Sequence, residues 1–184
     1  MDKRIWQWER TVDSQKFLLS SDPNLLPHDF VQEAFATEAM FWAKPMSEEA
    51  MKTMLSNSLT LGLYLDSGSD AQKPIGMARF VTDYTTLAYL TDVYLQPEYR
   101  NLGLGKWMIH CCRELALEMP ALRFMVLLTG SEQAQKLYRK ELGMQLLDGR
   151  EEPLTCMGAR KAALADVAAT AAASPGSKPT EADA

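Results

Sequence analysis

The hydrophobic and polar positions of this chain follow two periods, one typical of strands and one typical of helices. Short apolar runs bounded by turn residues predict strands at 17–20, 59–66, 73–83 and 87–95. The last three runs follow each other closely, so we expect an antiparallel meander. Alternation within 73–83 is expected to place four side chains on one face: Ile75, Met77, Arg79 and Val81.

Longer segments carry apolar residues at helical spacing. They predict helices at 28–42, 48–56, 106–119 and 131–143. Ser47 is a suitable N-cap for the second helix, and Gly143 suits the C-terminal end of the last. The continuously apolar run at 123–128 predicts a strand buried on both faces. Two short strands are expected at 144–147 and 154–157, which gives an α/β fold with a mixed α+β sheet.

The composition changes after Lys161. Residues 1–160 have the pattern of one domain, whereas 161–184 are rich in Ala, Ser, Pro and Gly and carry no aromatic residue. A segment of this composition cannot build a packed core. We therefore expect a single domain at 1–160 and a C-terminal tail at 161–184.

Charge and cysteine content narrow the function classes. The 19 Lys and Arg against 24 Asp and Glu give a net charge of −5, which is poorly suited to non-specific binding of nucleic acid or anionic membranes. Cys111, Cys112 and Cys156 form neither a disulfide framework nor a zinc pattern, and His28 and His110 are far apart. We expect reduced cysteines, no metal, no membrane span and a cytoplasmic or nuclear location.

The most informative segment is the loop Arg100-x-x-Gly103-x-Gly105, between a predicted strand and a predicted helix. Glycines allow close approach of a ligand to the backbone, and a helix N-terminus presents free N–H groups and a positive dipole end. This combination suits a pyrophosphate, with Arg100 and Lys106 adding charge. A plain glycine-rich turn remains the alternative. The Walker loop and the dinucleotide fingerprint are excluded, because no Ser or Thr follows Lys106 and Met108 occupies the third glycine position.

Two ordered motifs resemble the GNAT superfamily of acetyl-CoA-dependent N-acetyltransferases, in particular its small single-domain bacterial and fungal members. The first is the lead-in Pro97-Glu-Tyr-Arg100 with the spacing of Gly103 and Gly105. The second is Ala134-Gln-Lys-Leu-Tyr-Arg-Lys-Glu-Leu-Gly143, which has one residue more than the family element before its glycine. The resemblance covers roughly residues 17–160 and implies a strongly twisted mixed sheet, flanked by helices, that splays open beside the glycine loop.

The resemblance also implies a site for acetyl-CoA, with no metal. Ser131 is implied as a cofactor contact or a plain N-cap, and Val93 to Leu95 are implied to pair with the pantetheine arm. The backbone amides implied to hold the pyrophosphate are those of Arg100, Asn101, Leu102, Gly103, Leu104, Gly105 and Lys106.

Tyr138 is implied to be the acid that protonates the leaving CoA thiolate. Asp92 is the candidate base, with a structural anchor as the alternative, because strand alternation places it opposite Tyr89, Thr91, Val93 and Leu95. Asp83 and a water relay are the other options for the base.

The acceptor pocket is implied to include Trp42, Arg79, Tyr84 and Tyr89. Arg79 could bind a substrate carboxylate or form a cross-strand ion pair. The predicted function is direct acetyl transfer from acetyl-CoA to a primary amine of a small molecule, by a monomer or homodimer. A protein or peptide N-acetyltransferase and a non-catalytic acyl-CoA-binding module are the alternatives.

Overall fold

The computed structural model describes residues 4–66, 68, 72–147 and 157. The chain divides into two compact units, Met1–Met144 and Gln145–Ala184. All of the secondary structure below belongs to the first unit. The predicted tail at 161–184 and the predicted strand at 154–157 lie outside the described residues, Met157 excepted.

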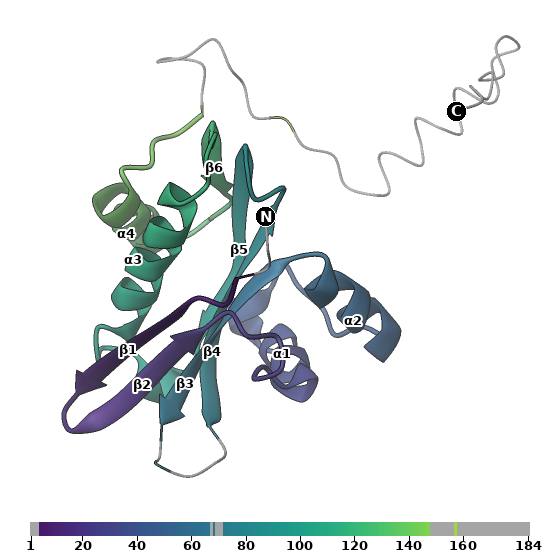
Figure 1. Ribbon diagram of the computed structural model, residues 1–184, viewed down its shortest axis with the longest axis vertical. Coiled ribbons are helices and arrows are strands. Elements are labelled where there is room, and N and C mark those ends of the chain that lie inside the picture. The colour runs from purple at the N-terminus through teal and green to yellow at the C-terminus, as the bar shows by residue number, and fades with distance from the viewer. Residues whose placement is uncertain (1–3, 67, 69–71, 148–156, 158–184) are drawn as a thin grey trace, which may run out of the picture. The chain divides into compact units, whose positions relative to one another are not determined.

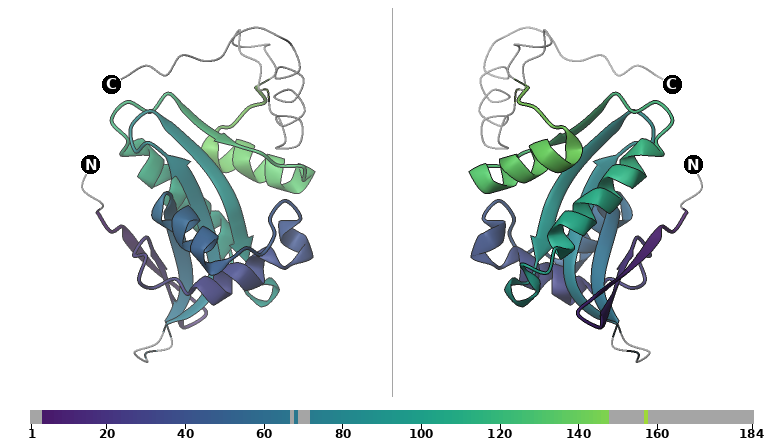
Figure 2. Two further views of the ribbon diagram at one scale, coloured as in Figure 1. Left: turned by 90° about the vertical axis from the view of Figure 1, so that its right-hand side faces the viewer. Right: turned by 90° about the vertical axis from the view of Figure 1, so that its left-hand side faces the viewer.

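Within the described residues, six strands form one sheet in the order of the chain (Figure 1). They are β1 (Gln7–Val12), β2 (Gln15–Ser20), β3 (Leu59–Asp66), β4 (Lys73–Thr82), β5 (Leu87–Leu95) and β6 (Phe124–Leu127). Neighbours from β1 to β5 pair antiparallel, and β6 pairs parallel with β5. The strands twist strongly along their length (Figure 2). The antiparallel and parallel pairings together confirm the predicted mixed sheet.

Helices cover both faces of this sheet (Figure 1). They are α1 (His28–Phe35), the 3₁₀ turn η1 (Glu38–Met40), α2 (Glu48–Ser56), the 3₁₀ turn η2 (Pro97–Tyr99), α3 (Leu104–Leu117) and α4 (Glu132–Leu142). One core cluster joins α3 to residues such as Phe17, Leu61 and Leu90. A second joins α1 and α2 to Met77 and Tyr94. The apolar faces of α1, α2 and α3 are thus buried, and α4 packs against α3.

Two irregularities break the simple alternation expected for the meander. Leu63 of β3 pairs with Gly76 of β4, and the next residue, Tyr64, pairs with Pro74. Ile75 is therefore an extra residue in β4. Ile75 consequently packs in the α3 cluster, whereas Met77 packs in the α1–α2 cluster. The prediction that Ile75 and Met77 share a face is therefore wrong, because a β-bulge shifts the side-chain period by one.

Other sequence predictions needed smaller corrections. The first helix ends at Phe35 rather than at residue 42. Just after this end, the Thr37 hydroxyl donates a hydrogen bond to the Ala34 carbonyl at 2.7 Å, and a separate 3₁₀ turn follows. β6 is half-buried rather than buried on both faces, and β5 is its one partner among the described strands. Residues 144–147 form no strand. The edge strand β1 was missed, since its exposed, mostly polar pattern gives little hydrophobic signal.

Gly62 offers a test of packing in the centre of the sheet. A Cβ built on Gly62 would lie 2.1 Å from the hydroxyl oxygen of Tyr64, whose side chain is fully buried. Gly62→Ala should therefore lower the free energy of unfolding by about 1–3 kcal/mol through overpacking, measured by urea denaturation. Gly130→Ala is the matched control, because nothing lies within 4 Å of its Cβ position. Equal stability of the two variants would show that the Tyr64 ring moves freely.

Candidate active site

The sheet opens between β5 and β6. Only Leu87–Leu90 of β5 pair with β6, opposite Phe124–Leu127, although β5 continues to Leu95. The amide of Gln96 donates to the Ile75 carbonyl of β4 at 2.9 Å. Because successive N–H groups of a strand point to opposite edges, the amide of Leu95 points away from β4, towards this split. The splayed sheet that the sequence predicts beside the glycine loop is confirmed.

The glycine loop joins the open end of β5 to α3. Asn101 and Gly103 both have left-handed backbone conformations, with φ of 68° and 72°, and Gly103 is the N-cap of α3. The Arg100 side chain turns back and donates from Nε to the Leu95 carbonyl at 3.1 Å. The first amides of α3 have no partner within the helix. The split and the positive end of a fourteen-residue helix therefore lie at the same end of β5.

The physical reason for a glycine differs between the two glycine positions of the loop. Gly103 is required by its positive φ. Gly105 lies inside α3, where a Cβ would approach nothing closer than the Leu95 Cδ2 atom at 3.9 Å, an ordinary contact. Glycine in a helix costs about 0.5–1 kcal/mol relative to alanine. The protein's own packing gives no reason for glycine at 105, so the residue fits a backbone surface that a ligand approaches.

Asp92 lies in the second irregularity of the sheet. Across β4 and β5 the pairing passes from Met77–Tyr94 to Arg79–Thr91, so Asp92 and Val93 together lie opposite Ala78. Asp92 has a φ of 50°, a left-handed conformation. The bulge reverses the alternation of β5, and the hydroxyl of Thr91 donates to Asp92 Oδ1 at 3.2 Å. The expectation that Asp92 points to the face opposite Thr91 is therefore wrong.

The buried carboxylate of Asp92 joins three segments of the chain. Arg79 on β4 donates to its Oδ2 from Nε at 2.7 Å and forms an ion pair through Nη2, also at 2.7 Å. Trp42, just after η1, donates from Nε1 to Oδ1 at 3.1 Å. Asp92 is 4% exposed. Both oxygens are thus engaged by donors, which favours the anchoring role and the ion-pair interpretation of Arg79.

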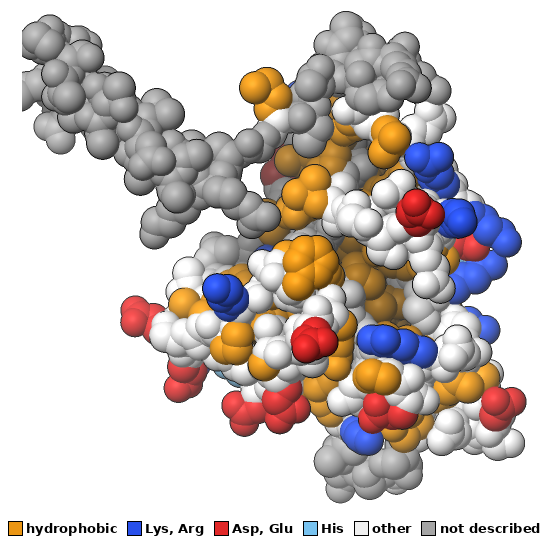
Figure 3. Space-filling model, turned by 180° about the vertical axis from the view of Figure 1, so that it is seen from behind, with side chains coloured by type: hydrophobic (Ala, Val, Ile, Leu, Met, Phe, Trp, Pro, Cys, Tyr) orange, Lys and Arg blue, Asp and Glu red, His pale blue; other side chains and the backbone are white. Residues whose placement is uncertain are grey.

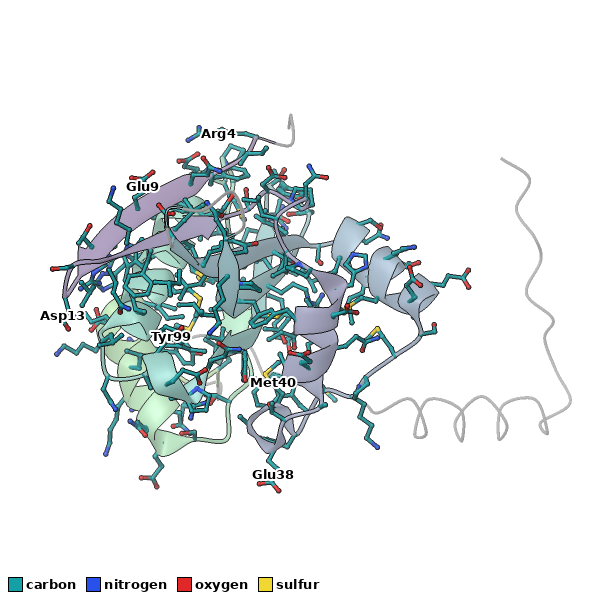
Figure 4. All side chains as sticks on the ribbon, turned by 90° about the horizontal axis from the view of Figure 1, so that it is seen from below. Arg4, Glu9, Asp13, Glu38, Met40 and Tyr99 are labelled. Atoms are coloured by element: carbon teal, nitrogen blue, oxygen red, sulfur yellow. The ribbon has the colours of Figure 1, made fainter. Side chains whose placement is uncertain are left out.

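An aromatic pair lies on the surface next to this carboxylate. Phe41 and Trp42 meet edge to face, with ring centroids 5.1 Å apart, and both are exposed. The preceding turn η1 holds them in place, because Met40 is buried while Glu38 points outward (Figure 4). Of the other predicted acceptor residues, Tyr89 is half-buried on β5, and Tyr84 lies in the β4–β5 turn with a φ of 59°.

The structure also limits the alternative catalytic groups. Asp83 accepts hydrogen bonds from the amides of Thr85, Thr86 and Leu87 and from the Thr86 hydroxyl. These bonds hold its pKa well below its usual range, so Asp83 is a turn residue and a poor base. Cys111 and Cys112 are free and buried. Burial raises the pKa of the Cys111 thiol to about 12, so it is inert at neutral pH.

Helix α4 carries Ser131 and Tyr138. The Ser131 hydroxyl accepts from the Ala134 amide at 3.3 Å and caps the helix, as the sequence predicts, and Gly143 ends it with a φ of 66°. Tyr138 is half-buried and packs against the α3 core cluster. Burial raises the pKa of Tyr138 to about 12, with a smaller contribution from Cys112. The phenol therefore keeps its proton at neutral pH.

A polar cluster between α3 and α4 was missed by the sequence reasoning. The Glu141 carboxylate of α4 pairs with Lys106 at 3.1 Å and with His110, and its backbone carbonyl accepts from Arg113 at 2.9 Å. These three partners lie at i, i+4 and i+7 of α3, so they share one face. The spacing of the basic residues was a signal in the sequence. The pKa of Glu141 is lowered chiefly by its hydrogen bond to His110.

The described residues contain no group of three or more His, Cys, Asp or Glu side chains that could hold a metal ion. No helix among them is long and apolar enough to cross a membrane.

Residues 28–144 match the profile of the acetyltransferase (GNAT) family. A Gibberella zeae protein named as an acetyltransferase is 32% identical over 142 residues, which cover 70% of this chain and 79% of that one. The chain belongs to the GNAT family of acetyltransferases.

Two further relatives agree with this GNAT assignment. A Pyropia yezoensis protein named as an N-acetyltransferase is 26% identical over 111 residues, or 59% of this chain and 62% of that one. The crystal structure of a GNAT-family acetyltransferase from Xanthomonas campestris superposes with a TM-score of 0.61 and 25% identity, covering 78% of this chain and 93% of that one. The resemblance inferred from the two motifs is thereby confirmed, and the protein is an acyltransferase enzyme.

The Arg79–Asp92 pair of this GNAT enzyme provides a test of its anchoring role. Arg79→Met should destabilise the protein by about 3–5 kcal/mol, because it leaves a buried carboxylate without its counter-ion. Adding Asp92→Asn should recover at least about 1 kcal/mol, since asparagine tolerates the positive φ and carries no charge. Urea denaturation of the wild type, both single variants and the double variant measures the coupling. Additive effects would contradict the pairing.

Proposed function

We propose that the protein transfers an acetyl group from acetyl-CoA directly to a primary amine, with a small molecule as the acceptor. The observation that carries the proposal is the common position of the split, the glycine loop and the α3 N-terminus at the end of β5. An extended arm can pair with the free edge of β5 while an anionic group meets the helix terminus. Acetyl-CoA combines both features, and the GNAT family implies its use.

The donor would be held mainly by backbone. The amides from Arg100 to Lys106 would bind the pyrophosphate, and the edge from Val93 to Leu95 would pair with the pantetheine. The open face at Gly105 supports this placement, because a Cβ there would meet no protein atom closely. Figure 3 shows Lys and Arg side chains gathered over α4, beside a hollow with apolar walls. Basic residues at this edge favour a polyanionic donor. The Ser131 hydroxyl caps α4, so any contact that it makes with the donor would be in addition to this capping role.

Acetyl-CoA supplies an activated thioester carbonyl, and the chain supplies positioning and a proton. N–H groups on the free edge of β5 would polarise the carbonyl oxygen. The acceptor amine attacks the carbonyl carbon, the carbon–sulfur bond breaks, and Tyr138 gives its hydroxyl proton to the departing sulfur. Burial raises the pKa of Tyr138 to about 12, so its hydroxyl carries a proton to give at neutral pH.

Asp92 would position the acceptor side of the site rather than remove a proton. Its oxygens hold Arg79 and Trp42, so the proton lost by the attacking amine would pass to water. The Trp42–Phe41 pair would then offer an aromatic surface to the incoming ammonium group, a contact that aromatic rings favour. Tyr89 remains a candidate for the acceptor wall. Arg79 is engaged by Asp92, so a substrate carboxylate is not assigned to it.

The function is tested by thiol release from acetyl-CoA in the presence of amines and peptides. Release that depends on small amines supports the proposal. Release that depends on peptides alone would replace it with a peptide N-acetyltransferase. Binding of acetyl-CoA with no release for any acceptor would favour a non-catalytic acyl-CoA-binding module.

Tyr138→Phe tests the acid. The variant should lower kcat by about 10²-fold, within the range of general acid catalysis, and leave the Kd for acetyl-CoA unchanged, because the ring still packs against α3. The active, protonated phenol persists below its pKa of about 12 and is lost above it. No alkaline limb from this residue should therefore appear up to about pH 10. A folded variant with wild-type kcat would exclude the acid role.

Gly105→Val tests the donor site. A Cβ at position 105 approaches no atom of the protein closer than 3.9 Å, so the melting temperature should stay close to that of the wild type. Calorimetry should show a loss of acetyl-CoA affinity of about 10²-fold or more, since the valine occupies the surface proposed for the pyrophosphate. Gly103→Val is the less informative variant, because its positive φ strains the fold. Unchanged affinity in folded Gly105→Val would refute the assignment.

A further inference from the structure

Helices α3 and α4 lie side by side (Figure 1), and the most buried residue of α4 is charged. Glu141 is the one buried residue among the eleven of this helix, and its side chain is 8% exposed. The apolar residues of α4 that pack against the α3 core cluster are Leu137, Tyr138 and Leu142, and they are only half-buried. A carboxylate in such a place is costly unless positive groups meet it. The docking of α4 therefore depends on the groups that α3 presents to Glu141.

Each oxygen of this carboxylate has its own partner on α3. The Nζ atom of Lys106 lies 3.1 Å from Oε1, and His110 contacts Oε2 through Nε2. Arg113 donates from Nη1 to the backbone carbonyl of the same glutamate at 2.9 Å. The best-attested use of buried polar contacts is to fix the register between packed elements. Three contacts at one residue thus define both the rotation of α4 and its position along α3.

Tyr138 lies on the same face of α4 as Glu141. The two residues are three positions apart, which is about 4.5 Å along the helix axis. The Tyr138 ring packs against the α3 core cluster, and Cys112 of α3 contributes to its raised pKa. Among the described residues, none forms a hydrogen bond with the Tyr138 hydroxyl. The position of this hydroxyl is therefore set by the docking of α4, one turn away, rather than by a bond of its own.

Lys106 connects the Glu141 contacts to the glycine loop. It is the third residue of α3 and follows Gly105 directly. Its side chain is 49% exposed, so the ammonium group meets Glu141 on one side and remains open on the other. An ammonium group has three donors, and one of them can bind the carboxylate while another meets an anion at the helix terminus. The same side chain thus contacts α4 and borders the site proposed for the donor.

We propose that Glu141 is a positioning residue for the transfer reaction: with Lys106 and His110, it docks α4 in the register that brings the Tyr138 hydroxyl to the departing sulfur. The inference rests on the proposed function, because that function makes Tyr138 the acid. Glu141 acts through the helix, and no bond is made or broken at its carboxylate. Removal of its charge leaves the donor, the acceptor and the phenol in place but loosens the alignment between them.

Amide hydrogen exchange tests the docking independently of activity. Glu141→Gln keeps the shape of the side chain and removes its charge, so the amides of α4 should exchange about tenfold or more faster, while those of β3 and β4 are unchanged. Glu132→Gln is the matched control, because it makes the same substitution at an exposed residue of the same helix. Equal exchange of α4 in the wild type and in Glu141→Gln would overturn the docking role.

A double-mutant cycle tests whether Glu141 acts through Tyr138. The assay is thiol release from acetyl-CoA, with the amine that gives the fastest release from the wild type. Glu141→Gln should lower kcat about tenfold in the wild type and less than about twofold in the Tyr138→Phe background, because a misplaced hydroxyl and a missing one have the same consequence. A merely structural role would lower kcat by the same factor in both backgrounds, and that result would overturn the proposal.

His110 offers a second pair of variants that does not touch the glycine loop and does not require Glu141→Gln to fold. His110→Leu removes the partner of Oε2 and should lower kcat about fivefold. His110→Lys returns a positive group to this position and should recover most of the loss. Equal losses in the two variants would contradict a role for charge at Glu141.

The outcomes distinguish this inference from the proposed function. Thiol release that Glu141→Gln and Tyr138→Phe lower non-additively supports both. Release that Glu141→Gln leaves at the wild-type kcat would overturn the positioning role and keep the acetyltransferase function. No release from the wild type with any acceptor would overturn the proposed function and the positioning role with it, whatever the exchange of α4 shows.

Discussion

The left-handed conformation of Asp92 in the middle of β5 is the constraint on which the site depends. One extra residue at this point reverses the side-chain alternation of the strand. It brings a carboxylate to the α1–α2 face, where Arg79 and Trp42 hold both of its oxygens. A non-glycine residue at positive φ is strained. The ion pair and the indole hydrogen bond stabilise that conformation, so the shape of the strand and the charge of its side chain support each other.

The same irregularity marks the limit of what the sequence predicts. Periodicity found β2 to β5, α2, α3 and α4, because each of these has a strong apolar face or a clear cap. It also identified the glycine loop, whose residue types serve backbone geometry directly. A bulge leaves no such signal. It changes which face a residue occupies without changing the composition of the strand, and the prediction for Asp92 therefore placed a plausible residue on the wrong face.

The sequence also did not reveal the roles of residues whose partners are distant in the chain. Glu141 is a common helix residue until α3 brings Lys106 and His110 against it. Arg79 fits a substrate contact or an ion pair equally well in the sequence, and only the register between β4 and β5 decides. Residues whose type suits a backbone conformation, such as Gly103 and Gly105, could be predicted from the sequence. Those that act through tertiary contacts could not, because their partners lie on other elements.

The agreement between strand order and chain order has a consequence for how the molecule assembles. The pairs β1–β2, β3–β4 and β4–β5 close through short connections, which keeps the cost of loop closure low. Two strands need long connections instead: β3 follows residues 21–58, which hold α1 and α2, and β6 follows the α3 crossover before it pairs in parallel with four residues of β5. Few ladder bonds hold β6 at the opening, so local fluctuations of the folded protein should concentrate where the two strands separate.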